Sequence, residues 1–206
     1  MEYLVTMTTQ VPNGTSDADI ETIRTREAAR SQELAAEGYL LRLWRPPVQP
    51  GEWRTIGMFE AAMRAELEAV LLSMPLRVWR TDDVVTLSPH PNDPGRQAGR
   101  PGSSVPPGGS SEFLTTFTVV VPPDASSMVV ETMDAREAER VRELAGQGEL
   151  LRLWALPGGG RALGLWRAHD AEEMQALLKS LPLSVWSSVA TMQLAPHPSD
   201  PGLTQN

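Results

Sequence analysis

The chain has 206 residues, of which 41% are hydrophobic, and it contains no cysteine. This length allows one or two globular domains, and the apolar fraction excludes a chain that is disordered throughout. The net charge of −8 argues against nucleic acid and anionic membranes as partners, because both attract clustered lysine and arginine. Without cysteine the chain has no disulfide, no thiol nucleophile and no thiolate metal ligand.

No segment has the pattern of a targeting signal or a membrane span. The first residues, 1–8, alternate like a strand and lack the charged and apolar regions of a signal peptide. No apolar run approaches the roughly 20 residues that a membrane helix needs. We therefore expect a cytoplasmic protein.

The chain repeats itself. Residues 2–44 align without a gap to residues 112–154, and about half of the aligned positions are identical, including LLRLW at 40–44 and at 150–154. A repeat of this length indicates two whole domains rather than a solenoid. We interpret the chain as a duplicated module.

The correspondence continues after a short gap to PHPNDPG and PHPSDPG, near the end of each copy. We expect module 1 over residues 1–94 and module 2 over 112–202. Residues 95–111 are rich in Gly, Pro and Ser without apolar periodicity, which is typical of a flexible linker.

Each module begins with a strand that leads into a long helix. Residues 3–8 alternate with a period of two, as in a half-buried strand. Ser16 is a typical N-cap, Gly38 stands where a helix-ending glycine belongs, and the second module has Ser126 and Gly148 at these positions.

Two further strands, a shorter helix and a last strand follow in both copies. A Pro/Gly-rich turn separates LLRLW from the third strand, and a proline ends the shorter helix. We expect long helices over about 16–37 and 126–147, short helices over about 61–73 and 169–180, and last strands over about 77–87 and 184–194.

The order β-α-β-β-α-β is the ferredoxin-like plan, a four-stranded antiparallel sheet with both helices on one face. The other face of such a sheet is bare, and two modules can cover each other's bare faces. The expected fold class is α+β, with two ferredoxin-like modules packed sheet to sheet as a dimeric α+β barrel-like pseudo-dimer.

An arginine stands among leucines in each LLRLW. Alternation places Arg42 and Trp44 on one side of the strand, and Arg152 and Trp154 likewise. A cation with aromatic walls suits a carboxylated organic ligand. The alternative is a structural arginine that stacks on tryptophan or pairs with a carboxylate across the sheet.

The third strand has an apolar row and a mixed row. We expect Ile56 and Met58 to face the helices, because both positions are apolar in the two copies. The opposite row, with Gly57 and Phe59 in module 1 and Trp166 in module 2, would then face the cavity beside the arginines.

A glutamate interrupts the apolar stripe of each long helix, at Glu27 and Glu137. A carboxylate on such a stripe is costly unless it is paired, and burial raises its pKa toward the range of a general acid or base. The alternative places Glu27 at the edge of the stripe, paired with Arg30 or Arg42.

The histidines give a weaker signal. His90 and His197 recur in the PHPxDPG segments. The flanking prolines make each segment stiff and extended, which suits a lid or a subunit contact. One histidine and one aspartate in each segment do not have the spacing of a metal site. The sequence has no Ser-His-Asp order, phosphate loop or dinucleotide fingerprint.

Four features together resemble the muconolactone delta-isomerase family of aromatic degradation: Arg26-Glu27 in the long helix, Leu43-Trp44-Arg45, the Pro75-Leu76 turn and His90-Pro91. The resemblance implies ferredoxin-like modules that dimerise sheet to sheet and assemble into larger rings. It also implies an isomerase that needs no cofactor and moves a proton along an unsaturated lactone carrying a carboxylate.

On this resemblance Glu27 moves the proton, Arg42 and Arg45 hold the carboxylate or stabilise dienolate charge, and aromatic side chains wall the pocket. We expect a small-molecule substrate, no cofactor, no metal, and no nucleic acid or membrane as partner, with assembly into a homo-oligomer of pseudo-dimers. The expected catalytic residues are Glu27, Glu137, Arg42 and Arg152. The expected substrate-binding residues are Arg45, Trp44, Trp154, Tyr3, Phe59, Trp166, His90 and His197.

The chain departs from the family pattern in being doubled, and its second copy has Ala155 in place of Arg45 and Phe113 in place of Tyr3. The sequence therefore leaves open whether one or both modules are active. Two alternatives also stay open: a cofactor-free cyclase or oxygenase that tailors a polyketide or aromatic natural-product intermediate, and a non-catalytic binding or assembly protein.

Overall fold

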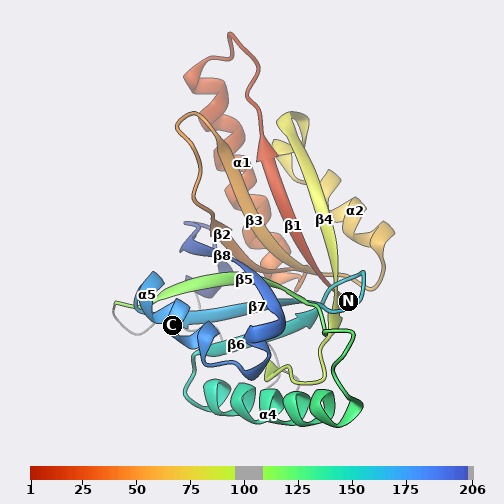
Figure 1. Cartoon of the computed structure of the whole chain (residues 1–206). Helices are drawn as coiled ribbons and strands as arrows, with labels where there is room; N and C mark the ends of the chain where they lie inside the picture. The colour runs from red at the N-terminus through yellow and green to blue at the C-terminus, as the bar shows by residue number, and fades with distance from the viewer. Residues whose placement is uncertain (96–108, 204–206) are drawn as a thin grey trace. The chain divides into compact units, whose positions relative to one another are not determined.

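The computed structural model describes residues 1–95 and 109–203 (Figure 1). These residues form two compact units: unit 1 holds 1–87 and 195–203, and unit 2 holds 88–95 and 109–194. Each unit therefore contains the PHPxDPG segment of the other sequence module. We call these segments the arms. Most of the expected linker, 96–108, lies outside the described residues.

The predicted order β-α-β-β-α-β is confirmed in both halves of the chain, each with a 3-10 turn before its last strand, and the fold is mixed α+β. The first half contains β1 (Glu2–Thr9), α1 (Asp17–Ala36), β2 (Leu40–Arg45), β3 (Trp53–Glu60), α2 (Arg64–Leu72), η1 (Pro75–Trp79) and β4 (Arg80–Pro89). The second half contains β5 (Ser111–Val119), α4 (Ser127–Gly146), β6 (Leu150–Ala155), β7 (Arg161–Ala168), α5 (Ala171–Lys179), η2 (Pro182–Trp186), β8 (Ser187–Pro196) and η3 (Pro201–Leu203).

The ends of the long helices follow from local chemistry. The Asp19 N–H donates to the Ser16 side chain at the start of α1, and the predicted Ser126 cap acts in the same way at the start of α4. Gly38 has φ 86° and Gly148 has φ 78°, a left-handed conformation that ends a helix at little cost only for glycine.

The strands of each unit form an antiparallel sheet. In unit 1 the order is β4-β1-β3-β2, and the end of β8 pairs with β2 where Trp44 lies opposite Pro196. In unit 2 the order is β8-β5-β7-β6, and the end of β4 pairs with β6 where Trp154 lies opposite Pro89. The packing of the two sheets against each other stays a prediction.

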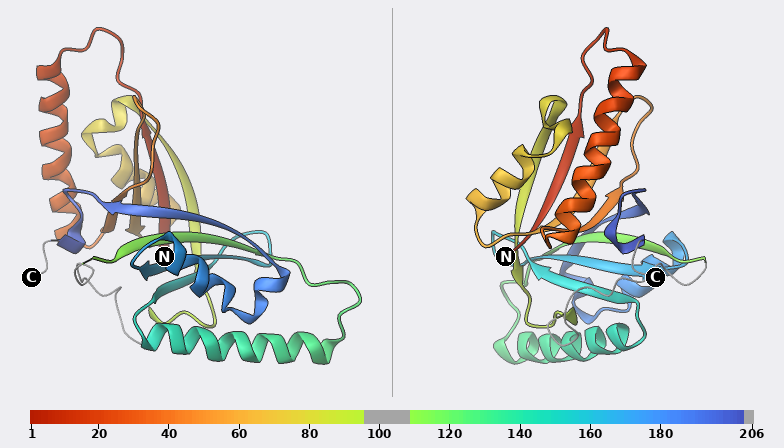
Figure 2. Two further views of the ribbon diagram at one scale, coloured as in Figure 1. Left: turned by 60° about the vertical axis from the view of Figure 1, so that its left-hand side comes forward. Right: turned by 180° about the vertical axis from the view of Figure 1, so that it is seen from behind.

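One face of the unit 1 sheet packs against α1 and α2, which lie on the same side of it (left view of Figure 2). Leu34 of α1 and Leu67 of α2 are fully buried against Val5 and Phe59 of the strands. Unit 2 repeats this core. No helix in the part of the chain that the structure describes combines the length and apolar character needed to cross a bilayer.

The prediction that Ile56 and Met58 of the third strand, β3, face the helices is wrong. Phe59 packs in the core beneath the helices, and its ring lies so close over Gly57 that a Cβ there would overlap it. Ile56 and Met58 point to the other face, and both are buried as well. Because both faces of this strand are buried, apolar character does not reveal which face meets the helices.

Candidate functional site

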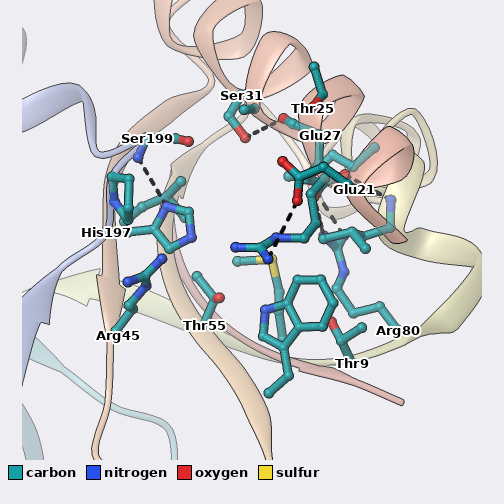
Figure 3. A pocket seen from close by; sticks show the side chains of 18 residues that line it. Thr9, Glu21, Thr25, Glu27, Ser31, Arg45, Thr55, Arg80, His197 and Ser199 are labelled. Carbon is teal, nitrogen blue, oxygen red and sulfur yellow. Dashed lines mark hydrogen bonds and ion pairs between the residues drawn. The ribbon is translucent and has the colours of Figure 1, made fainter. Parts of the chain in front are cut away.

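Unit 1 has a cavity of about 330 Å³ between α1 and the helix-covered face of its sheet, which we call cavity 1 (Figure 3). Helix α1 provides Glu27 and Ser31, β2 provides Arg45, and the C-terminal arm provides His197. Glu27 and Arg80 lie on one side of the cavity in Figure 3, and Arg45 and His197 on the other.

Glu27 is held by two donors. The backbone N–H of Leu76 donates to Oε2 at 2.8 Å, and Nη1 of Arg80 donates to Oε1 at 3.0 Å. Leu76 stands at the start of η1, where backbone N–H groups lack partners within the turn. Burial raises the pKa of the Glu27 carboxyl, and the Leu76 N–H and the Arg80 charge oppose that rise. A carboxyl whose pKa is raised in this way is better suited to accept and release a proton than an exposed glutamate.

Arg80 is the partner that sequence reasoning missed. Its side chain is only 2% exposed, and its Nε lies 2.7 Å from Oδ1 of Asp82, so it bridges two acids. Neither cation that we weighed as a partner for Glu27 holds it: Arg30 pairs with Glu33 instead. The one signal in the sequence was a difference between the copies, since the equivalent of Arg80 is a serine.

His197 reaches cavity 1 from the arm. Its backbone N–H donates to the Leu43 carbonyl at 3.2 Å, and its Nδ1 accepts the Ser199 N–H at 3.1 Å. Burial lowers the pKa of His197 to about 4, with added effects from the Arg45 and Arg24 charges. The ring is therefore neutral at pH 7 with its proton on Nε2, where it can donate a hydrogen bond.

Arg42 and Arg152, the arginines of the two LLRLW strands, do not line cavity 1 or its counterpart in unit 2. Each instead stacks on a tryptophan and pairs with a carboxylate, which is the structural alternative to ligand binding. Arg42 lies 4.8 Å from the Trp44 ring centre and 3.1 Å from Asp200 Oδ2. Arg152 stacks on its own tryptophan in the same way and pairs with Asp93. Each buried arginine thus fastens an arm to its unit.

The expected aromatic residues divide into two groups. Tyr3 and Phe59 lie in the core of unit 1, and Trp44 and Trp154 are buried against the arginines, so none of the four is among the described residues that line cavity 1 or its counterpart in unit 2. Trp166 does line the cavity of unit 2. The wall of cavity 1 instead includes residues that we did not expect: Arg24, Trp53 and Met74.

Unit 2 has a cavity of about 410 Å³ in the equivalent place, which we call cavity 2. Glu137 lines it and accepts the Leu183 N–H at 2.9 Å, and His90 of the other arm lines it too. Burial raises the pKa of the Glu137 carboxyl, opposed by the Leu183 N–H, while the nearby Asp134 charge adds to the rise. No arginine or lysine occurs among the described residues that line cavity 2.

The chemistry open to the two cavities differs. Cavity 1 combines a proton-exchanging carboxyl with Arg24 and Arg45 and so suits an anionic substrate, whereas cavity 2 keeps the carboxyl without the cations. Among residues 1–95 and 109–203, no three histidine, aspartate or glutamate side chains lie together as a metal site would need.

The chain matches a known protein family over most of its length. A family model described as Muconolactone delta-isomerase matches residues 1–93 and residues 111–200. The Muconolactone Delta-isomerase of Cupriavidus pinatubonensis is 32% identical over 92 residues, 45% of this chain and 97% of that protein. That of Rhodococcus opacus is 26% identical over 88 residues, 43% of this chain and 95% of that protein.

Solved structures share the fold. A heme-binding protein from Thermus thermophilus matches with a TM-score of 0.60 at 10% identity, over 97% of this chain and 93% of that one. The chlorite dismutase from Candidatus Nitrospira defluvii in complex with imidazole matches with a TM-score of 0.57 at 11% identity, over 95% and 91%. At these identities the likeness concerns the fold alone.

Proposed function

Because this chain belongs to the muconolactone delta-isomerase family, we propose that it is a cofactor-independent isomerase whose working site is cavity 1. The proposed substrate is an unsaturated lactone, or a related conjugated small molecule, that carries a carboxylate. The observation that carries the proposal is Glu27, a buried carboxyl in a cavity that three arginines line, Arg24, Arg45 and Arg80.

Glu27 would move the proton. Its carboxylate removes a proton from a carbon beside the conjugated system, which leaves a dienolate on the substrate and a neutral carboxyl on the enzyme. The same carboxyl returns the proton to a different carbon of the dienolate, so the double bond shifts and no atom is gained or lost. The pKa of Glu27, raised by burial, suits a group that must first accept a proton and then release it.

The arginines of cavity 1 would have two roles, positioning Glu27 and binding the substrate carboxylate. Arg80 holds the Glu27 carboxylate and is itself paired with Asp82, so we assign it the role of a positioning residue. Arg45 and Arg24 line the cavity and would bind the substrate carboxylate. This proposal replaces Arg42, whose guanidinium pairs with Asp200 outside the cavity.

His197 would support the intermediate. Its neutral ring can donate a hydrogen bond from Nε2, and the two arginines beside it lower its pKa further. A fixed donor next to the developing dienolate oxygen stabilises charge at the moment when it forms. The arm thus adds a polar group that α1 and the sheet do not supply.

Turnover of muconolactone, followed by ultraviolet absorbance, tests the proposal. We expect the wild-type chain to isomerise it and Glu27→Gln to lose about 100-fold or more of kcat/KM. Glu137→Gln is the matched control and should stay within about threefold of wild type, because cavity 2 lacks the cations. Folded wild-type protein without turnover, or a larger loss in Glu137→Gln than in Glu27→Gln, would contradict the proposal.

A further inference from the structure

Cavity 2 is equivalent to cavity 1 in position. In the sheet of unit 1, Arg80 lies opposite Thr9, and in unit 2 Ser187 lies opposite Val119. Each cavity has one helix glutamate that accepts the N–H of the leucine after a proline. The two cavities can therefore be compared residue by residue.

The cations of cavity 1 have no equivalents in unit 2. The positions of Arg24 and Arg45 are occupied by an aspartate and an alanine. Ser187 stands at the position of Arg80, and its hydroxyl donates to the Leu183 carbonyl at 2.7 Å. An anion entering cavity 2 would lose its hydration without meeting a compensating charge among the lining residues that the structure describes.

Apolar side chains have replaced polar ones around the same space. Phe117 stands at the position of Met7, and two polar positions of cavity 1 are valine in cavity 2. The valines and their counterparts are Val119 for Thr9 and Val141 for Ser31.

The polar groups that remain disfavour an anion. Asp134 and Glu137 both line the cavity, and burial lowers the pKa of His90, which is therefore neutral at pH 7. The indole N–H of Trp166 donates to Thr115 at 2.8 Å, so the cavity meets the ring rather than its donor. Cavity 2 is therefore a mainly apolar space in which Glu137 can accept a hydrogen bond from a ligand.

We propose that cavity 2 is a separate binding site for an uncharged, mainly apolar aromatic molecule whose one hydroxyl or amine group donates a hydrogen bond to Glu137. This inference does not rest on the proposed isomerase activity of cavity 1. The ligand proposed for cavity 2 is uncharged, whereas the substrate proposed for cavity 1 is an anion.

Two dyes with one aromatic skeleton test the proposal by fluorescence titration. N-phenyl-1-naphthylamine is neutral with a single N–H donor, and 8-anilinonaphthalene-1-sulfonate adds a negative charge to it. Ala138→Phe fills cavity 2 and Ala28→Phe, at the equivalent place, fills cavity 1. Circular dichroism and thermal melting of each variant check that it is folded.

The neutral dye should bind saturably and lose at least about tenfold in affinity in Ala138→Phe, with a change below about twofold in Ala28→Phe. The sulfonate should be unaffected by Ala138→Phe. Three results would overturn the proposal: no saturable binding of the neutral dye, loss of that binding in Ala28→Phe instead, or sulfonate binding that Ala138→Phe abolishes. If Ala138→Phe does not fold, Ala162→Phe is used to fill cavity 2 instead, and Thr55→Phe, at the equivalent position of cavity 1, is its matched control.

Discussion

Asp200 forms a buried ion pair with Arg42, which precedes it by 158 residues, and also accepts the Leu43 N–H at 2.9 Å. Three residues before Asp200, His197 lines cavity 1. One aspartate therefore fixes both the C-terminal arm and the position of a proposed site residue. Asp93 has the same relationship to Arg152 in unit 2.

Asp200→Asn should lower both stability and activity. The substitution breaks the buried ion pair between Asp200 and Arg42, and breaking such a pair costs about 3–5 kcal/mol in free energy of unfolding. The arm would also loosen and displace His197, so kcat/KM for the lactone should fall about tenfold or more. Asp93→Asn is the matched control, with a similar stability loss but activity within about threefold of wild type. Equal activity losses in the two variants, measured well below their melting temperatures, would refute this role.

Arg45→Ala, which introduces the residue of the second copy, should weaken substrate binding. A hydrogen bond to a charged group contributes about 1.5–3 kcal/mol, so KM should rise roughly 10- to 100-fold with little change in kcat. Arg54→Ala is the control, because Arg54 lies on the neighbouring strand and does not line cavity 1. Steady-state kinetics decide the matter: an unchanged KM in Arg45→Ala would remove this arginine from the substrate site.

Arg80→Ser should shift the acid limb of the pH–rate profile to higher pH. The Arg80 charge and hydrogen bond lower the pKa of Glu27, while burial and Asp82 raise it, so loss of the arginine leaves the rise unopposed except by the Leu76 N–H. Glu27 must be ionised to accept the proton, so activity at neutral pH should fall. Arg80→Lys keeps the positive charge, so the acid limb of its pH–rate profile should lie closer to the wild-type pH. A lower rate with an unmoved limb would indicate a structural role only.

Glu137→Gln should stabilise the chain at neutral pH. Burial raises the pKa of Glu137 in the folded state, so the folded chain holds a proton at pH values where the unfolded chain has released it. Ionisation of the Glu137 carboxyl at neutral pH therefore destabilises the folded chain. A glutamine cannot ionise, and its side-chain oxygen can still accept the Leu183 N–H. The gain in Tm should be present at pH 7 and should vanish as the pH falls toward 4.5, the ordinary carboxyl value. A gain that is independent of pH would contradict this explanation.

The sequence by itself determined the element order, the ends of the long helices and the glutamate in each of them. These features depend on neighbours within a few residues: the period of apolar positions, a serine that caps α1 and a glycine with positive φ after it. It also showed the chemical difference between the copies, because Arg45 and its counterpart Ala155 can be compared without any coordinates.

Only the tertiary structure decided which groups meet. Arg80 approaches Glu27 across 53 residues, and Asp200 approaches Arg42 from the far end of the chain, separations over which periodicity carries no information. The face of the third strand was equally hidden, because Phe59 and Met58 are both fully buried. Buried charges must find partners wherever the fold brings them, so the pairing of Arg42 with Asp200 rather than with a substrate emerged only once the chain was folded.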